Sequence, residues 1–516
     1  MGGLKNLLRN NNSKEIASQN NNFTIFPKTN KLNSIINYID NEYVDTVDIE
    51  KITDSAIPAI LNELDPHSVY IPASELKKYN EPLIGNFSGI GVQFNMSNDT
   101  VAIINTIPNG PSEIVGILAG DRIVKVDGEK VSGVKMPSDS VIVRLKGPKG
   151  TIVHVTIKRK GEKELLDFQI TRGDIPLYSV DVAYMINKNT GFIKINTFAQ
   201  TTYDEFLEAI QKLHPLGMSK LILDLRSNGG GVMDAATKIA DEFLDGKKLI
   251  VYTQGRAKDR FNVYSTPGGL CINDELIILI DEYSASASEI LAGAIQDNDR
   301  GTIIGRRSFG KGLVQEQLQF RDGSGMRLTI ARYYTPTGRS IQKPYGKDRN
   351  HYYMDLNERL LHGEMENADS IHFKDSLKFV TPAGKVVYGG GGIMPDIFIP
   401  VDTTGFSNYF EKVRNSGFIY RFAFDYSDNN RKALFKLKTA DEISDYLDKT
   451  AYYGEFLNYA DSKGVPKNEK DLVISENILK VQLKAYIARN IIDNNGFYPI
   501  IQNIDTTLKK AIAIMN

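Results

Sequence analysis

The sequence predicts a multidomain α/β protein, in which a β-rich module precedes an α/β core and helical segments stand at both ends. Its 516 residues are enough for roughly three to four domains. Short β-rich runs separated by turns fill residues 86–172, and buried strands alternate with helices from about 180 to 400. Helical periodicity marks about 30–65 and 405–516. These patterns together predict the fold class.

The first helical segment is predicted from apolar residues at helical spacing in two runs, 32–39 and 57–64. Pro66 ends the segment, because proline cannot continue a helix. Residues 1–22 are polar and rich in asparagine, which favours a disordered tail and matches neither a signal peptide nor a membrane anchor. We expect a signal or anchor to be absent from this chain.

The β-rich module is predicted to hold four strands and one helix, separated by turns such as Asp127-Gly128. The strands are Gly91–Phe94, Val101–Asn105, Arg122–Val126 and Val153–Lys158, and the helix is Ser112–Leu118.

The α/β core is predicted from alternating strands and helices, in which two of the strands are continuous apolar runs. The strands are Gly191–Asn196, Leu221–Leu225, Leu276–Ile280 and Thr302–Ile304, and the helices are Tyr203–Leu213, Val232–Leu244 and Ala287–Gln296. Residues 405–516 show helical periodicity without a chemical motif.

Composition excludes several classes of protein. A net charge of -1 supplies no strong field, so neither nucleic acid nor an acidic membrane surface is an expected partner. No stretch reaches the roughly 18 apolar residues of a membrane helix. The single cysteine, Cys271, cannot form an intramolecular disulfide and is expected to be a half-buried filler. No His, Cys, Asp and Glu cluster stands at ligand spacing, so no metal or cofactor is expected.

The first stretch that can carry chemistry is Asp224-Leu-Arg-Ser-Asn-Gly-Gly-Gly231, which follows a buried strand and opens a helix. Its glycines allow a sharp turn and leave N–H groups free to stabilise an anion, either a phosphate or a reaction oxyanion. The stretch lacks the spacing of a phosphate-binding P-loop. The alternative is a tight packing turn.

The second stretch is Ser284-Ala-Ser-Ala-Ser-Glu-Ile290, which also joins a buried strand to a helix. A serine at such a bend can project its hydroxyl into a cleft. Ser286 and Glu289 equally match a capping box, so plain helix capping is the alternative.

The third stretch places Lys311 between two glycines, Gly310 and Gly312, which let the amine approach another group; a solvated loop lysine is the alternative. A serine nucleophile needs a base. None of the six histidines falls in the stretch that carries the glycine turns and the serine. Lysine is the other known partner of serine, provided that burial lowers its pKa, and Gln315 can orient the amine.

Together these stretches resemble the C-terminal processing peptidases, which are also called tail-specific proteases. The resemblance covers about 60–402 and includes Leu64-Asp-Pro-His-Ser-Val-Tyr70, which resembles the segment before the family's PDZ domain. Further motifs in the family's order lie at 87–92, 119–128, 221–226, 284–290, 309–315, 333–339 and 389–396.

The resemblance implies a serine endopeptidase in which Ser286 is the nucleophile, Lys311 the general base and Gln315 the supporting residue. The run 284–288 alone does not tell which of its three serines acts. An oxyanion hole is implied at Ala287 and at Gly229 or Gly230. Many family members have proline where this chain has Gly229, and proline lacks an N–H.

The resemblance also implies that a PDZ domain captures protein tails. Its carboxylate-binding loop corresponds to Gly89, Ile90, Gly91 and Val92, and the apolar side chains of Ile90 and Val92 favour an apolar substrate C-terminus. The alternative is a PDZ domain that only packs on the core as a lid.

Two rivals to an active protease remain at the level of sequence: a non-catalytic peptide-binding scaffold, and an enzyme that a partner switches on. A periplasmic or cell-envelope location follows from the resemblance alone, and the C-terminal helices can mediate oligomers. The predicted ranges are a disordered tail (1–22), a helical N-terminal segment (23–83), a PDZ domain (84–173), a serine protease core (174–403) and a helical C-terminal domain (404–516).

Overall fold

A computed structural model describes residues 30–97, 99–346 and 349–516, so the tail predicted over 1–22 lies outside the described residues. The chain divides after Leu64 into two compact units. The first contains the helices α1 (Lys31–Glu42) and α2 (Ile49–Asn62), which confirms the predicted helical segment. The Asp48 side chain begins α2 by accepting a hydrogen bond from the Lys51 N–H at 3.0 Å.

The second unit opens with the short strand β1 (Val69–Ile71) and the helix α3 (Ala73–Ile84). Strand β2 (Asn86–Gly89) follows and pairs antiparallel with β9 (Gly173–Pro176). The β-rich module lies between these two strands, so the chain enters and leaves the module side by side.

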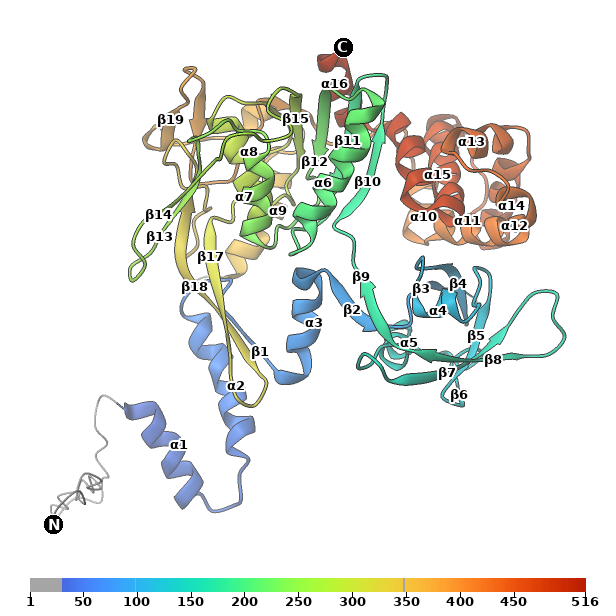
Figure 1. The fold of residues 1–516 in the computed structure, drawn as a ribbon, viewed down its shortest axis with the longest axis horizontal. Helices are drawn as coiled ribbons and strands as arrows, with labels where there is room; N and C mark the ends of the chain where they lie inside the picture. Colours follow the sequence, from blue (N-terminus) through green and yellow to red (C-terminus); the bar gives the residue numbers. More distant parts are fainter. Residues whose placement is uncertain (1–29, 98, 347–348) are drawn as a thin grey trace. The chain divides into compact units, whose positions relative to one another are not determined.

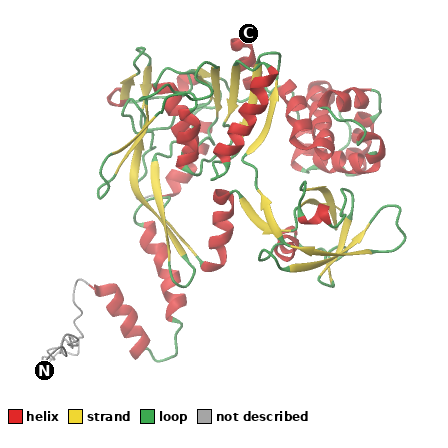
Figure 2. Ribbon diagram, in the orientation of Figure 1, coloured by secondary structure: helices red, strands yellow, loops and turns green. Residues whose placement is uncertain are grey.

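The β-rich module is one sheet in the order β3-β4-β5-β7-β8, with β6 paired to β5. Figure 2 shows the strands in yellow. Its strands are β3 (Val92–Ser97), β4 (Thr100–Thr106), β5 (Arg122–Val126), β6 (Glu129–Lys130), β7 (Ile152–Lys158) and β8 (Leu166–Thr171). The four predicted strands are confirmed. The predicted helix shrinks to α4 (Pro111–Ile114), and α5 (Ser138–Leu145) was not predicted.

The α/β core is a sheet in the order β10-β11-β12-β15-β16-β21, parallel except for β10 (Figure 1). Its strands are β10 (Val180–Met185), β11 (Thr190–Ile195), β12 (Lys220–Asp224), β15 (Glu275–Ile280), β16 (Thr302–Gly305) and β21 (Ile397–Phe398). The connecting helices are α6 (Thr202–Leu213), α7 (Met233–Asp241) and α8 (Ala287–Asp297).

Successive residues of a strand point to opposite faces of a sheet, so the unbroken apolar runs of the central strands make both faces of this sheet apolar. Leu221, Leu223 and Ile278 pack in one cluster with residues of α6, α7 and α8. Ile222 and Ile277 pack in another cluster, with the last helix of the chain, α16 (Thr506–Met515). Burial on both faces explains the continuous apolar runs of the central strands.

A second, antiparallel sheet carries the hairpin that follows Lys311, and β1 pairs with its long strand β18. Besides β1, the strands of this sheet are β13 (Leu249–Gln254), β14 (Phe261–Tyr264), β17 (Leu313–Gln319) and β18 (Gly325–Tyr334). Beyond it lie α9 (Arg349–Leu361) and the strands β19 (Lys378–Val380) and β20 (Val386–Tyr388).

The C-terminal region is helical, as predicted, and has its own apolar core. Its helices before α16 are α10 (Asn408–Asn415), α11 (Phe418–Asn429), α12 (Arg431–Leu434), α13 (Ala440–Asp448), α14 (Tyr452–Ser462) and α15 (Glu469–Ile501). Helix α15 is kinked at Ile492 and Asp493, whose backbone angles are not helical. In the part of the chain that the structure describes, no helix is both long and apolar enough to span a membrane.

Candidate active site

The three chemistry-bearing stretches meet because they follow neighbouring parallel strands. The glycine turn follows β12, the serine run follows β15, and the loop with Lys311 follows β16. Parallel neighbours end at the same edge of a sheet, which is where sites form in α/β folds. A cavity of about 540 Å³ lies there, and its lining includes six of the predicted site residues: Gly229, Gly230, Ser286, Ala287, Lys311 and Gln315.

The hydroxyl groups of the serine run differ in what they contact. The Ser284 hydroxyl is buried and donates to the Leu225 carbonyl at 2.8 Å. The Ser288 hydroxyl is also buried and donates to the Asn228 carbonyl at 2.9 Å. Ser286 is half-buried and lines the cavity. The structure therefore distinguishes the three serines, which the sequence pattern alone does not.

The backbone of Ser286 is strained, with φ 56° and ψ -112°. A non-glycine residue held at positive φ is often part of a functional turn. The opposing glycine turn makes room for it: a Cβ atom on Gly230 would lie 2.6 Å from the Ala285 carbonyl oxygen and 2.7 Å from the Ser286 Cβ. Gly230 itself has φ +95°, so glycine is required there for two reasons.

The Lys311 amine lies in the cavity wall in surroundings that disfavour its charge. Burial lowers the pKa of Lys311 below its ordinary value, and the nearby Arg327 guanidinium lowers it further, whereas Glu289 and Asp65 oppose the shift. Lys311 Nζ donates to Gln315 Oε1 at 3.0 Å. The Gln315 amide in turn donates to the His67 carbonyl at 2.5 Å, so its orientation is fixed.

His67 is the histidine that the structure brings to this neighbourhood, although sequence reasoning set it aside in another segment. Its ring nitrogen Nε2 lies 2.7 Å from the Tyr352 hydroxyl. Burial, and then the positive charge of Lys311, lower the pKa of His67 to about 4, so the ring is neutral at neutral pH. The residues that line the cavity include no histidine.

Glu289 connects the serine run to the lysine loop. Its fully buried carboxylate accepts hydrogen bonds from the N–H groups of Ser286 at 2.8 Å and Lys311 at 2.9 Å. The Gly310 N–H and the Ser308 hydroxyl donate to it as well, at 2.7 and 2.5 Å. Burial raises the pKa of Glu289 to about 7 against the opposing effect of these hydrogen bonds. The capping-box pattern marked this residue, but only as a helix cap.

Tyr333 makes a second connection between the same two segments. Its hydroxyl contacts the Ser286 carbonyl at 3.0 Å and also the Lys311 carbonyl. Neither the position of Tyr333 in the site nor the role of Glu289 follows from spacing in the sequence, since the partners come from different strands.

Arg226, which precedes the glycines of the turn, forms ion pairs with two carboxylates. Arg226 Nη2 donates to Asp224 at 2.6 Å and to Asp505 of the C-terminal region at 2.7 Å. Burial alone would raise the pKa of Asp224, but the charges of Arg226 and Lys194 hold it at about 2. The sequence offered no sign of Asp505, because an ion pair between distant residues leaves no pattern.

The backbone donors around the cavity are not equivalent. The Gly230 N–H donates to Asn228 Oδ1 at 2.9 Å. Within the described residues, the N–H groups of Gly229 and Ala287 donate to no protein acceptor, and Ala287 is the first residue of α8. An anion in the cavity would find these two donors unoccupied.

None of the predicted tail-binding residues lines the cavity. Gly89 ends β2, and Ile90, Gly91 and Val92 follow it at the start of the β-rich module. Ile90 is 2% exposed and belongs to the core of that module, so its side chain is not available to a ligand. Its carbonyl already accepts hydrogen bonds from the Ser112 N–H at 3.0 Å and from the Ser112 hydroxyl at 2.6 Å. Gly91 has φ +72° and turns the chain into β3. Among the strands that the structure describes, β3 pairs only with β4, which leaves its other edge open.

Cys271 is fully buried, so the expectation of a half-buried side chain was wrong. It lies before β15, at the opposite end of that strand from the serine run.

Three segments of the chain match known protein families. Residues 189–349 match Peptidase family S41, and residues 88–170 match the PDZ domain. Residues 409–493 match a family of unknown function (DUF8443). The first two matches fall inside the ranges 174–403 and 84–173, whose boundaries stay predictions.

The carboxy-terminal-processing protease of Bartonella bacilliformis is 36% identical over 328 residues, which are 63% of this chain and 74% of that protein. The chain belongs to the carboxy-terminal processing proteases. CtpB of Bacillus subtilis, another carboxy-terminal processing protease, is 32% identical over 61% of this chain and 65% of its own length. A solved photosystem II D1 C-terminal processing protease is 30% identical, with a TM-score of 0.35, over 59% of this chain and 81% of its own.

As a carboxy-terminal processing protease, the chain combines a PDZ domain with a protease domain that follows it. The β-rich module is that PDZ domain, and the cavity lies in the protease domain. The fold class predicted from the sequence is therefore confirmed.

Proposed function

We propose that this protein is a serine endopeptidase in which Ser286 attacks the peptide bond, Lys311 is the general base and Gln315 holds the amine in place. One observation carries the proposal: Ser286 and Lys311 line the same cavity, while Ser284 and Ser288 donate their hydroxyls to backbone carbonyls. The lowered pKa of Lys311 supports it, since only a neutral amine can accept a proton.

The reaction proceeds by acyl transfer. Lys311 Nζ accepts the Ser286 proton as Oγ bonds to the carbonyl carbon, and the tetrahedral intermediate forms. The C–N bond then breaks, and the lysine gives its proton to the leaving amine. A water molecule attacks the acyl-enzyme while Lys311 takes its proton, and the departing Ser286 oxygen recovers that proton. The cycle restores both residues without a metal or a cofactor.

The oxyanion hole is proposed at Ala287 and in the glycine turn. The Ala287 N–H stands at the beginning of α8, where the helix dipole favours negative charge. The Gly229 N–H is unoccupied, whereas the Gly230 N–H is held by Asn228, which supports Gly229 as the second donor in this chain.

The PDZ domain is proposed to capture the C-terminal tail of a substrate. A peptide can add as a strand to the open edge of β3 (Val92–Ser97), and the turn at Gly89–Gly91 can hold its carboxylate. An apolar last residue stays the expected preference. A cell-envelope location and an oligomer through the C-terminal helices stay predictions as well.

The deciding experiment compares cleavage of an unstructured protein with an apolar C-terminus by the wild type, Ser286→Ala and Ser284→Ala. We expect cleavage by the wild type, none by Ser286→Ala, and substantial cleavage by Ser284→Ala, which loses the buried hydrogen bonds of its hydroxyl to Leu225 and Asp281 but keeps Ser286. Activity in Ser286→Ala would refute the nucleophile. No cleavage by the folded wild type would leave a peptide-binding scaffold or a partner-activated enzyme.

An amidated substrate is the second arm of this experiment. Amidation of the terminal carboxylate should raise the KM for the protein substrate. Amidation of a small peptide that is too short to reach the PDZ domain should leave its rate of cleavage unchanged. An unchanged KM would refute tail capture by the PDZ domain without touching the assignment of Ser286.

A further inference from the structure

His214, Cys271 and Asp274 converge at the edge of the core sheet opposite the candidate active site. His214 follows α6, and Cys271 and Asp274 immediately precede β15. The serine run follows the carboxyl end of that same strand, so the two groups of residues lie at opposite ends of β15. Nothing in the proposed cleavage reaction uses this cluster.

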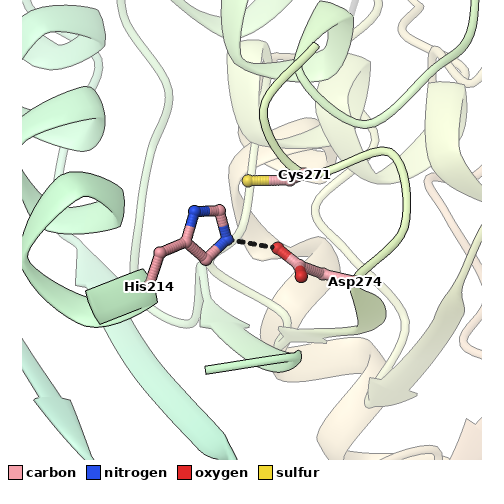
Figure 3. Close-up of side chains that lie close together, drawn as sticks. All are labelled: His214, Cys271 and Asp274. Carbon is pink, nitrogen blue, oxygen red and sulfur yellow. Dashed lines mark hydrogen bonds and ion pairs between the residues drawn. The ribbon is translucent and has the colours of Figure 1, made fainter. Parts of the chain in front are cut away.

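The ligand atoms of the three side chains face one another, as Figure 3 shows. One nitrogen, one sulfur and one oxygen atom all lie within 4.8 Å of one another. His214 Nε2 lies 2.8 Å from Asp274 Oδ2. His214 and Asp274 are 60 residues apart in the sequence, which explains why ligand spacing did not predict the cluster.

The loop that carries two of the three side chains is firmly held. The Cys271 N–H donates to the Glu242 carbonyl at 2.9 Å, and the Asp274 N–H donates to the Cys271 carbonyl at 3.2 Å. Arg300 Nη2 donates to the carbonyls of Cys271 at 2.7 Å and Asp274 at 2.6 Å. A preorganised loop keeps the entropy cost of binding a ligand low.

Solvent reaches the cluster from one side. Cys271 is fully buried, whereas the side chains of His214 and Asp274 are 32% and 10% exposed. An ion can enter past the imidazole, and a water molecule can complete its coordination there. Two anionic ligands would balance a divalent charge, and the Arg300 guanidinium, which faces the loop carbonyls, opposes the cation.

The set of donor atoms selects the metal. Thiolate and imidazole are ligands of zinc, and a carboxylate is its third common ligand, whereas calcium and magnesium require oxygen donors. Three protein ligands with an open fourth position is a known zinc arrangement.

We propose that His214, Cys271 and Asp274 bind one Zn²⁺, with water as the fourth ligand, and so fasten the end of α6 to the loop before β15. Binding releases the thiol proton, because zinc coordinates the thiolate. The His214–Asp274 hydrogen bond then opens, and both side chains turn to the metal. The inference is independent of the proposed cleavage reaction.

Cobalt(II) is the probe that tests the site, because it reports its ligands by absorption. Cys271 is the only cysteine of the chain, so any thiolate-to-cobalt charge-transfer band must come from it. We expect the metal-stripped full chain to bind one equivalent of Co²⁺ with that band and with tetrahedral d–d bands. One equivalent of Zn²⁺ should bleach both.

Two variants and a control complete the test. Cys271→Ala should abolish the charge-transfer band. His214→Asn, at a partly exposed position, should weaken Zn²⁺ binding by at least about 100-fold, because even losing an outer-shell partner costs 10–100-fold. His154→Asn removes an exposed histidine that lies 3.7 Å from Asp127 and should change nothing. Circular dichroism confirms that each variant is folded.

Three results would overturn the proposal: no charge-transfer band in the wild type, Zn²⁺ affinity unchanged in His214→Asn, or equal weakening in His154→Asn. The first means that the His214–Asp274 contact is a hydrogen bond without a metal. The other two place the ion elsewhere on the chain.

Discussion

In the proposed mechanism, the charge of one side chain, the Lys311 amine, sets the pH at which the candidate site can work. Its ordinary pKa of 10.5 is lowered by burial and by Arg327. A base must be neutral, so the active fraction of the enzyme grows as pH rises through the lowered pKa. The neutral ring of His67 adds no competing charge near neutral pH.

We therefore expect kcat/KM to rise with pH along a single limb and then to level off at the lowered pKa of Lys311. Lys311→Arg should lose at least about 100-fold in kcat/KM at every pH, because a guanidinium does not deprotonate and general-base catalysis contributes 10²–10⁴-fold. Steady-state cleavage of a peptide across the pH range measures both.

Lys258→Ala is the control, since this lysine is 54% exposed and pairs with Glu316. Its pH profile should match the wild type. A Lys311→Arg variant that keeps the wild-type limb would assign the base to another group.

At this same scale the sequence was informative where a residue stands in a distinctive local pattern. Lys311 between two glycines and the serine run could both be found, because each pattern is local. Glu289 and Asp505 could not be assigned their roles. Their partners are backbone N–H groups or an arginine brought close by folding, and such contacts leave no spacing to read.

At the scale of elements, the glycine turn can lie close to the beginning of α8 because Gly230 has no side chain. Gly230 packs against the bend at Ser286, whereas no atom of the described residues lies within 4 Å of the place where a Cβ on Gly229 would be. The two neighbouring glycines thus differ: the Gly229 N–H is the proposed oxyanion donor, and Gly230 leaves space for the bend at Ser286.

Gly230→Ala should lower kcat/KM by about 100-fold or more, because a shift of about 1 Å at the nucleophile has that effect. Gly229→Ala should stay within a few-fold of the wild type, since the added methyl group meets no atom and its N–H remains. Cleavage rates of the two folded variants decide. Equal losses in both would show that steric contact with Ser286 is not what Gly230 avoids.

Elements were predictable in proportion to how regular their apolar pattern is. The core strands are unbroken apolar runs, and α6 has a clear helical stripe, so they were predicted within a few residues. The hairpin β17–β18 was missed because most of β17 is exposed and polar. Helix α3 lies almost entirely within the predicted helical segment 23–83, but its own bounds were not predicted, because it buries only Leu76 and Glu81.

At the scale of the whole molecule, helix α16 (Thr506–Met515) completes the protease domain. Helix α16 covers the face of the core sheet that α6, α7 and α8 leave uncovered, through Leu508, Ala511 and Met515. Its N-cap Asp505 also holds Arg226 beside the glycine turn. The C-terminal region therefore supports the site, although no motif in it suggests chemistry.

Leu508→Ala should lower the free energy of unfolding by about 2–5 kcal/mol, as expected for a fully buried leucine. Ile514→Ala, on the same helix but 37% exposed, should cost less than about 1.5 kcal/mol. Urea unfolding of both variants measures the difference. Equal, small effects would mean that α16 does not stabilise the sheet.

The antiparallel pair β2–β9 has a consequence for how such proteins diversify. Its partnered residues, from Asn86 with Pro176 to Gly89 with Gly173, place both ends of the PDZ domain side by side at the distance of neighbouring strands, about 5 Å. The PDZ domain is thus an insertion that is joined to the rest of the chain by two adjacent strands. A different recognition domain whose ends are adjacent could be inserted at the same place. The domain proposed to select substrates could therefore be replaced during evolution while the protease core stays the same.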